Sequence, residues 1–238
     1  MQPDRMLYLP LTPAFFSILI IIFIVLAVSI EFRVLRYAYM QLGVSSRTAM
    51  FLLLGSLIGS YFNIPLVEIS NHVTSSGRVI QFFGMHYQVP PASGQAGTII
   101  AVNVGGGVIP TFMSIYLLWH YNLWLKGVIA TAVVAAVCYW LATPVPGMGI
   151  AIPVFVPAIA TAIIALVLDR NYVAPLAYAS GALGTLIGAD LLNLGKVAGL
   201  GAPVASIGGA GTFDGIFLTS IVAVLLGSLT TRSAAQPA

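Results

Sequence analysis

Long uninterrupted apolar stretches dominate the chain, and short polar segments separate them. A helix crosses the ~30 Å hydrocarbon core of a bilayer with about 20 apolar residues. The pattern therefore predicts an all-α polytopic membrane protein with about seven transmembrane helices, built as a single transmembrane domain over 1–238. The predicted spans are 14–32, 48–67, 98–119, 125–143, 149–168, 173–194 and 204–228.

The first and the middle stretches leave room for other interpretations. Arg5 followed by an apolar run resembles a signal peptide, but the run is long enough to span and arginines follow it, so we expect an uncleaved first helix. Between 125–143 and 149–168 stands TPVPGMG, whose two prolines break a helix. These two stretches are either two full spans or a re-entrant pair.

The longest polar connection is 68–97, which is punctuated by glycine and serine. Its patch RVIQFFGMHYQV alternates between apolar and polar residues, as a β-strand does. We expect a short hairpin in an extramembrane loop on the outer surface. Its role, whether gating or partner binding, stays open.

The orientation follows from the distribution of basic residues, which favour cytoplasmic loops. With the N-terminus outside and the C-terminus in the cytoplasm, most of the nine Lys and Arg side chains fall on the inner side. We expect a multi-pass protein of the cell (inner) membrane. The inner side would hold Arg33, Arg36, Arg47, Lys126, Arg170 and Arg232, and the outer side Arg5, Arg78 and Lys196.

Composition excludes several other classes of protein. Charged residues make up 6% of the chain, against about 25% in soluble domains, so no sizeable soluble domain is expected. The basic residues form no run or stripe, and we expect the lipid bilayer rather than nucleic acid as the partner. Cys138 is the single cysteine, which excludes an intrachain disulfide. The oligomeric state is left open.

Two pairs of similar segments predict an internal repeat. GSLIGSYFNI at 55–64 echoes GTLIGADLLN at 184–193, and NVGGGVIPTF at 103–112 echoes SIGGAGTFDG at 206–215. The second and third spans would then correspond to the sixth and seventh, in a first repeat over 48–119 and a second over 173–228. Both halves would run in the same sense through the membrane.

Two aspartates stand inside apolar stretches. A charged Asp in mid-bilayer costs roughly 2.5–3.5 kcal/mol, and such residues usually mark a functional site. Asp190 and Asp214 lie equally far from the centre of the connection between the last two spans, near Ala202, so the two carboxyls would sit at one depth. Facing each other, they would share one proton, and such a pair can activate water against a peptide carbonyl.

Two resemblances bear on these motifs. The segment GTFD at 211–214 resembles the Gly-x-hydrophobic-Asp motif of intramembrane aspartyl proteases, which implies Asp190 and Asp214 as catalytic residues and Gly211 beside the substrate. Ala189 stands where presenilin-like enzymes have Tyr, and nothing after Asp214 matches their Pro-Ala-Leu motif. Over roughly 40–230, GSLIGSYFNIP, AVNVGGGVIP, GTLIGADLLNL and SIGGAGTFDGIF together resemble the prokaryotic membrane family called domain of unknown function 1614, which implies a membrane location and no activity.

A di-aspartyl intramembrane protease, acting on a membrane-protein or peptide substrate, is the leading hypothesis. The first alternative is a transporter or channel for a small solute or ion, because glycine breaks in membrane helices free backbone groups for binding. The second alternative is a non-catalytic subunit, in which the aspartates only join helices. The predicted substrate-binding residues are Asn63, Asn103, Asn193, Gly105, Gly106, Gly208, Gly209 and Gly211.

A metal site receives little support from the sequence. Glu68, His72 and His86 share the long polar loop, but HExxH and CxxC patterns are absent. Loop residues of this kind are usually solvated. We expect no metal and no cofactor.

Overall fold

A computed structural model describes residues 13–75, 79–82, 85–88, 92–145, 149–153, 155–197, 204–209 and 215–230. The chain is mostly helical, with strands between the helices. In chain order the elements are α1 (Pro13–Met40), α2 (Ser46–Gly59), β1 (Asn63–Ser75), β2 (Val79–Phe82), β3 (Met85–Gln88), β4 (Ala92–Asn103), the π-helix Val104–Val108, α3 (Ile109–His120), α4 (Trp124–Leu141), β5 (Thr143–Val145), β6 (Gly149–Ala151), α5 (Phe155–Leu168), α6 (Val173–Thr185), the π-helix Leu186–Asp190, the 3₁₀ turn Leu191–Asn193, α7 (Leu194–Val197), β7 (Val204–Ile207) and α8 (Gly215–Thr230).

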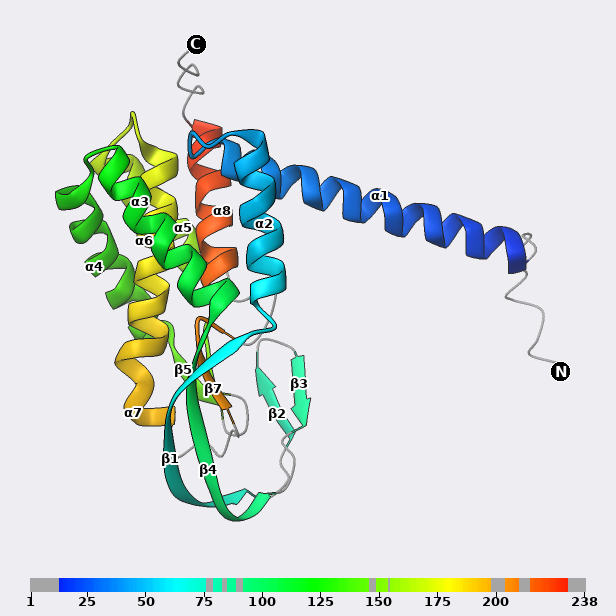
Figure 1. Ribbon diagram of the computed structural model, residues 1–238, viewed down its shortest axis with the longest axis vertical. Helices are drawn as coiled ribbons and strands as arrows, with labels where there is room; N and C mark the ends of the chain where they lie inside the picture. The colour runs from blue at the N-terminus through cyan, green and yellow to red at the C-terminus, as the bar shows by residue number, and fades with distance from the viewer. Residues whose placement is uncertain are drawn as a thin grey trace, which may run out of the picture.

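Helices α2 to α6 and α8 form one bundle, with α6 buried among its neighbours (Figure 1). Small residues allow this close packing. A Cβ on Gly181 would lie 3.2 Å from the Cα of Ser220 in α8, and one on Gly184 would meet Val134 in α4. The small-residue spacing of α6 therefore sets the separation of the helices around it.

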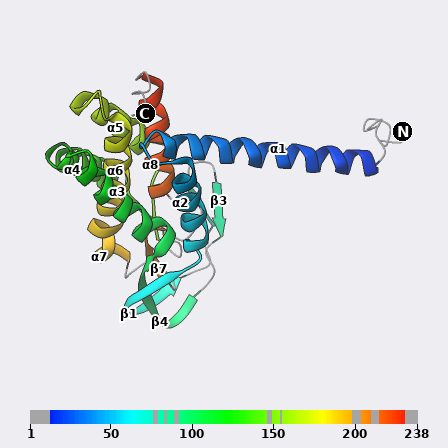
Figure 2. The same cartoon turned by 45° about the horizontal axis from the view of Figure 1, so that its top comes forward.

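Helix α1 differs from the rest because most of its length extends away from the bundle (Figures 1 and 2). Its last turns pack on the bundle through the buried residues Ala38 and Tyr39. The Tyr39 ring lies 5.9 Å from that of Tyr178 in α6. Between Ile21 and Ile30 the apolar side chains are largely exposed, so α1 has no protein core of its own there.

A three-stranded sheet in the order β1–β4–β7 lies below the bundle (Figure 1). Strands β1 and β4 form a long antiparallel hairpin that pairs Asn63 with Asn103 and carries an irregularity between Pro65 and Val67. Strand β7 joins β4 in parallel, with Ile99 opposite Val204. Because β4 leads into α3 and β7 precedes α8, both strands point toward the bundle.

The short hairpin predicted in 68–97 is present as β2–β3. The flanking strands β1 and β4 extend into two segments predicted as helical spans. The segment 48–67 is helix α2 followed by the start of β1, and 98–119 is the end of β4, a π-helix and α3. The segment 204–228 likewise begins as β7 before α8. The residues at these strands, such as TIIAV and VASI, are rich in β-branched side chains, which favour strands.

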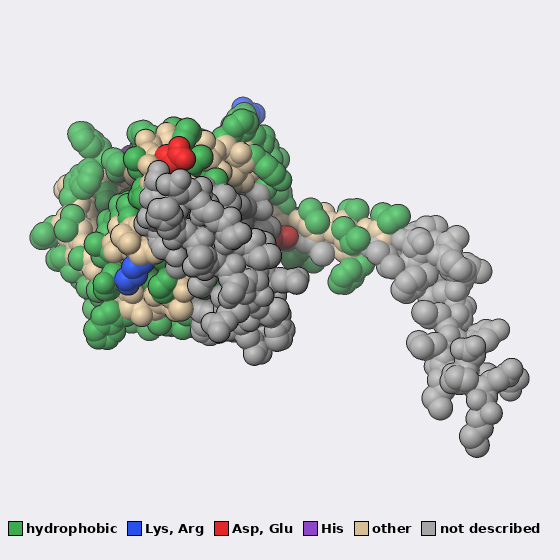
Figure 3. All heavy atoms as spheres, turned by 90° about the horizontal axis from the view of Figure 1, so that it is seen from below, with side chains coloured by type: hydrophobic (Ala, Val, Ile, Leu, Met, Phe, Trp, Pro, Cys, Tyr) green, Lys and Arg blue, Asp and Glu red, His purple; other side chains and the backbone are tan. Residues whose placement is uncertain are grey.

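Two helices in the described ranges are long and apolar enough to cross a membrane, namely α4 and the continuous helix Val173–Val197 that includes α6 and α7. Shorter apolar helices are α2, α5 and α8. Between α4 and α5 the proline-containing segment forms the small β5–β6 hairpin. Seen from below, the described surface is mainly hydrophobic, with isolated charged side chains (Figure 3).

Candidate functional site

The two glycine-rich segments meet where β4 and β7 end, at an arrangement that we call the glycine crossover (Val104–Val108 and Gly208–Gly209). A Cβ on Gly106 would collide with the carbonyl oxygen of Gly208, and one on Gly107 would lie 3.1 Å from that of Ile207. Gly208 and Gly209 have φ values of 90° and 79°, which side chains rarely permit. The crossover therefore depends on glycine for both close approach and backbone conformation.

Asn103 joins three elements at the crossover. Its side chain is 0% exposed, and its Oδ1 accepts a 2.8 Å hydrogen bond from the backbone N–H of Gly106. Its Nδ2 donates to the carbonyl of Ser60 at 2.8 Å and to Oδ1 of Asn63 at 3.0 Å. One buried amide thus holds the end of α2, the start of β1 and the first turn of the π-helix together.

The polar network continues from Asn63 to β7. The hydroxyl of Ser206 lies 2.7 Å from Oδ1 of Asn63 and 2.8 Å from the carbonyl oxygen of Gly209. Because a hydroxyl has one hydrogen, it donates to one of these oxygens at a time. Asn63 is exposed, so the network reaches the surface at this end.

Asp190 attaches the continuous helix of α6 and α7 to the crossover. It is the last residue of the π-helix Leu186–Asp190, and its Oδ2 accepts a 2.8 Å hydrogen bond from the backbone N–H of Gly208. Single-turn π-helices inside α-helices are frequent at functional sites. The sequence-predicted carboxylate therefore contacts a sequence-predicted glycine.

Asn193 lies one turn beyond Asp190, at the end of the 3₁₀ turn. Its Nδ2 donates to the carbonyl oxygens of Gly188 and Ala189, at 2.9 and 3.0 Å. These carbonyls belong to the π-helix, where the regular ladder of α-helical bonds is interrupted. Oδ1 of the same side chain is buried and has no hydrogen-bond partner among the described residues.

The structure brings together most of the site predicted from the sequence. Asp214 and Gly211 lie outside the described residues, so the aspartate pair stays a prediction. Within the described ranges, no three His, Cys, Asp or Glu side chains gather closely enough to hold a metal ion. The predicted residues at or next to the crossover are Asn63, Asn103, Gly105, Gly106, Asp190, Asn193, Gly208 and Gly209.

Two serines of the site were not singled out from the sequence. Ser56 donates a 2.7 Å hydrogen bond to the carbonyl of Gly105, and Ser206 contacts Asn63. Both stand in the repeated motifs, close to glycine in GSLIGS and SIGG. These two serines could have been predicted as site residues from their position beside the glycines, because backbone carbonyls freed by an irregular backbone need hydrogen-bond donors.

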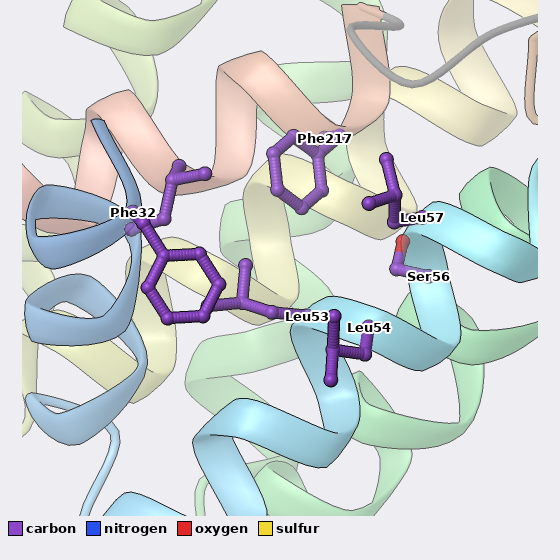
Figure 4. A pocket seen from close by; sticks show the side chains of 7 residues that line it. Phe32, Leu53, Leu54, Ser56, Leu57 and Phe217 are labelled. Atoms are coloured by element: carbon purple, nitrogen blue, oxygen red, sulfur yellow. The ribbon is translucent and has the colours of Figure 1, made fainter. Parts of the chain in front are cut away.

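A pocket of about 70 Å³ lies between α1, α2 and α8, next to the crossover (Figure 4). Its lining is apolar apart from Ser56, whose hydroxyl already donates to Gly105. The pocket therefore offers little to a charged or strongly polar solute. The residues that line it are Phe32, Leu35, Leu53, Leu54, Ser56, Leu57 and Phe217.

The model of one protein family, described as "Protein of unknown function (DUF1614)", matches residues 57–226. The chain belongs to this family. The matched segment begins within α2 and ends within α8, so it includes the whole glycine crossover and leaves α1 outside. No curated protein and no solved structure matches the chain.

Proposed function

We propose that this DUF1614 protein is an integral membrane protein of the cell membrane. Helix α4 supports this because its two ends carry Trp124 and Trp140, roughly 24 Å apart at 1.5 Å per residue, which approaches the hydrocarbon thickness. Apart from Lys126 in the first turn, the outward side chains between them are mainly apolar, and Leu125 and Trp140 are 77% and 89% exposed. Tryptophan favours the two membrane interfaces, and lipid would cover the apolar surface between them.

The proposed orientation has the N-terminus outside, about seven crossings and the C-terminus in the cytoplasm. Arg47, Lys126 and Arg170 stand at the start of α2, at the start of α4 and after the end of α5. These helix ends belong to the same end of the bundle, whereas Lys196 in α7 stands at the opposite end (Figure 1). The excess of basic residues at one end would face the cytoplasm.

The internal repeat also belongs to this proposal. In each half a strand leads through a glycine-rich segment toward a helix, as β4 does toward α3 and β7 toward α8. The parallel pairing of β4 with β7 supports two halves that run in the same sense. A repeat of this kind would place equivalent glycine segments at one central site.

We propose that the glycine crossover is the binding and passage site of a transporter or channel for a small solute or ion. The observation that carries this proposal is the contact between the two glycine segments, with the N–H of Gly208 bonded to the carboxylate of Asp190. Interrupted backbone and a carboxylate inside an apolar bundle are costly unless they line a site. Asn63, Asn103 and Ser206 would supply uncharged contacts.

The test is solute flux through vesicles that contain the purified full chain. Wild-type protein should raise the flux of at least one member of a panel of protons, monovalent cations and small neutral solutes. Asp190→Asn keeps an oxygen for the Gly208 N–H but removes the charge, and it should reduce that flux at least roughly tenfold. Asp169→Asn is the matched control, because Asp169 lies outside the crossover. Equal flux in empty and protein-containing vesicles would refute the transport proposal.

The protease remains the second candidate function, with Asp190 and Asp214 as its catalytic pair. In its favour, Asp190 stands at a π-helical irregularity in a helix of the bundle, where backbone groups freed from the regular α-helical ladder could bond to a substrate peptide. The same wild-type and Asn variants, incubated with membrane-helix substrates, separate the two functions. Cleavage that is lost in both Asp190→Asn and Asp214→Asn would establish the protease. Flux without cleavage favours transport.

A further inference from the structure

Four buried side-chain oxygens have no hydrogen-bond partner among the described residues, and the amide oxygen Oδ1 of Asn193 is the one that lies next to the glycine crossover. The side chain is 0% exposed, and leaving a buried acceptor without a hydrogen bond destabilises the folded state. The fold accepts this cost in the turn directly after Asp190. A ligand that supplies positive charge to this oxygen would remove the cost.

The orientation of the Asn193 amide is fixed by its neighbours. Both carbonyl oxygens within reach, those of Gly188 and Ala189, need a donor. Reversing the amide would place Oδ1 about 3 Å from two carbonyl oxygens and would leave Nδ2 without acceptors. Oδ1 is therefore the atom that is turned away from the carbonyl oxygens of Gly188 and Ala189.

Asp190 and Asn193 lie on the same face of their helix. Asp190 directly precedes the 3₁₀ turn Leu191–Asn193, and Asn193 is its last residue. Residues three apart in such a turn stand one above the other. The carboxylate of Asp190 and the amide oxygen of Asn193 can therefore reach a common ion. Carboxylate and amide oxygens are hard ligands, which suit small hard cations.

We propose that Asp190 and Asn193 bind a small monovalent cation, of which Na⁺ is the probe, as the transported ion. This inference rests on the proposed transport function and names its substrate class. The charge balance favours a monovalent ion, because the single carboxylate of this pair neutralises one positive charge and a divalent ion would leave an excess charge in an apolar bundle.

The experiment measures saturable binding of radioactive Na⁺ to the full chain in lipid nanodiscs, at ionic strength held constant with choline. Asp190→Asn removes the charged ligand and should weaken binding at least roughly tenfold. Asn193→Ser removes the amide oxygen but keeps a hydroxyl that can donate to a backbone carbonyl, and it should weaken binding about threefold to tenfold. Circular dichroism and gel filtration check that each variant is folded.

Asp169→Asn is the control, because Asp169 is a carboxylate that binds Lys126 away from the crossover. It should leave Na⁺ binding unchanged. The proposal is overturned if Na⁺ does not bind saturably, if Asp190→Asn binds as wild type does, or if Asp169→Asn weakens binding equally. Na⁺ binding without flux would support the site and refute transport. Flux of another solute without Na⁺ binding would support transport and refute the Na⁺ site.

Discussion

The absence of a side chain at individual glycines determines whether the crossover can form. A methyl group on Gly106 would meet the carbonyl oxygen of Gly208, and one on Gly208 would meet the backbone of Gly107 while φ is 90°. Backbone atoms cannot move aside as a flexible side chain can. The glycines of this site are therefore required by space, and at Gly208 by conformation as well.

We predict that Gly106→Ala and Gly208→Ala each lower the free energy of unfolding by about 2–4 kcal/mol. Gly195→Ala is the matched control, because a Cβ there has nothing within 4 Å. In a helix this control should be neutral or stabilising by up to ~1 kcal/mol. Thermal unfolding of the purified proteins measures the difference, and equal melting temperatures for Gly106→Ala and Gly195→Ala would contradict the close approach.

The buried amide of Asn103 allows a second prediction at this scale. Asn103→Asp keeps an acceptor for the Gly106 N–H but loses the donor to Ser60 and sets a carboxylate against Oδ1 of Asn63. We expect a loss of about 2–4 kcal/mol in unfolding free energy, as for a buried unpaired charge. Asn171→Ala, on the exposed connection before α6, should cost less than ~0.5 kcal/mol in the same assay.

At the scale of elements, the sequence located the helices better than the strands. Helix α4 begins and ends close to the predicted 125–143, and α5 ends where the predicted 149–168 ends, because these apolar runs end at loops. Helix α5 begins only at Phe155, because Gly149–Ala151 forms strand β6. The runs 48–67 and 98–119 contain both a helix and a strand, and only isolated polar residues such as Asn63 and Asn103 interrupt them. Hydrophobicity does not distinguish a buried strand from a buried helix, so the boundary at Asn63 could not be predicted from it.

The site likewise contains residues that could be predicted from the sequence and contacts that depend on the tertiary structure. Asp190 and the glycine runs were predicted because acidic residues and repeated glycines are conspicuous in apolar sequence. The contact between Gly106 and Gly208 depends on the parallel pairing of β4 with β7, which local patterns do not encode. Ser206 was overlooked because its partner Asn63 is distant in the chain.

Between elements, the ion pair of Lys126 and Asp169 joins the start of α4 to the end of α5 at 2.7 Å. Burial alone would raise the pKa of Asp169, but hydrogen bonds from Lys126 and from the backbone N–H groups of Asn171 and Tyr172 lower the pKa below its ordinary value. A depressed carboxyl pKa stabilises the folded state above the unfolded pKa. That stabilisation is lost as the pH falls through the folded pKa.

We predict that Asp169→Asn lowers the unfolding free energy at neutral pH by about 0.2–1 kcal/mol, as expected for a solvent-screened pair. The difference from wild type should begin to shrink as the pH falls below roughly 4, where the unfolded carboxyl takes up a proton, and should vanish below the pKa of the folded carboxyl. Melting temperatures measured at several acidic and neutral pH values test this. A difference that persisted at the lowest pH would assign the effect to packing instead.

At the scale of the whole molecule, Arg47, Lys126 and Arg170 gather at one end of the bundle. The sheet lies at the opposite end (Figure 1). The proposed orientation places Arg170 in the cytoplasm and Lys196 toward the outside. We predict that Arg170→Cys and Lys196→Cys, each in a Cys138→Ala background, react with a membrane-impermeant maleimide from opposite sides. Intact cells should label the second variant alone, and inverted vesicles the first.

Both labelled variants need the same controls. Cys138 is buried, so its replacement by alanine should leave the background unlabelled and folded. Labelling of the two positions from one side would refute the proposed topology. Extraction of the protein by alkaline carbonate would refute membrane integration altogether.

The parallel pairing of β4 with β7 also has a consequence for biosynthesis. Helices α3 to α7 lie between these strands in the chain, so the sheet stays incomplete until β7 has left the ribosome. During translation the edge of β4 that pairs with β7 stays uncovered in the nascent β1–β4 hairpin. Gly106 cannot contact Gly208 until β7 is synthesised near the end of the chain. Any chain that stops before Val204 would carry every preceding helix yet lack the crossover.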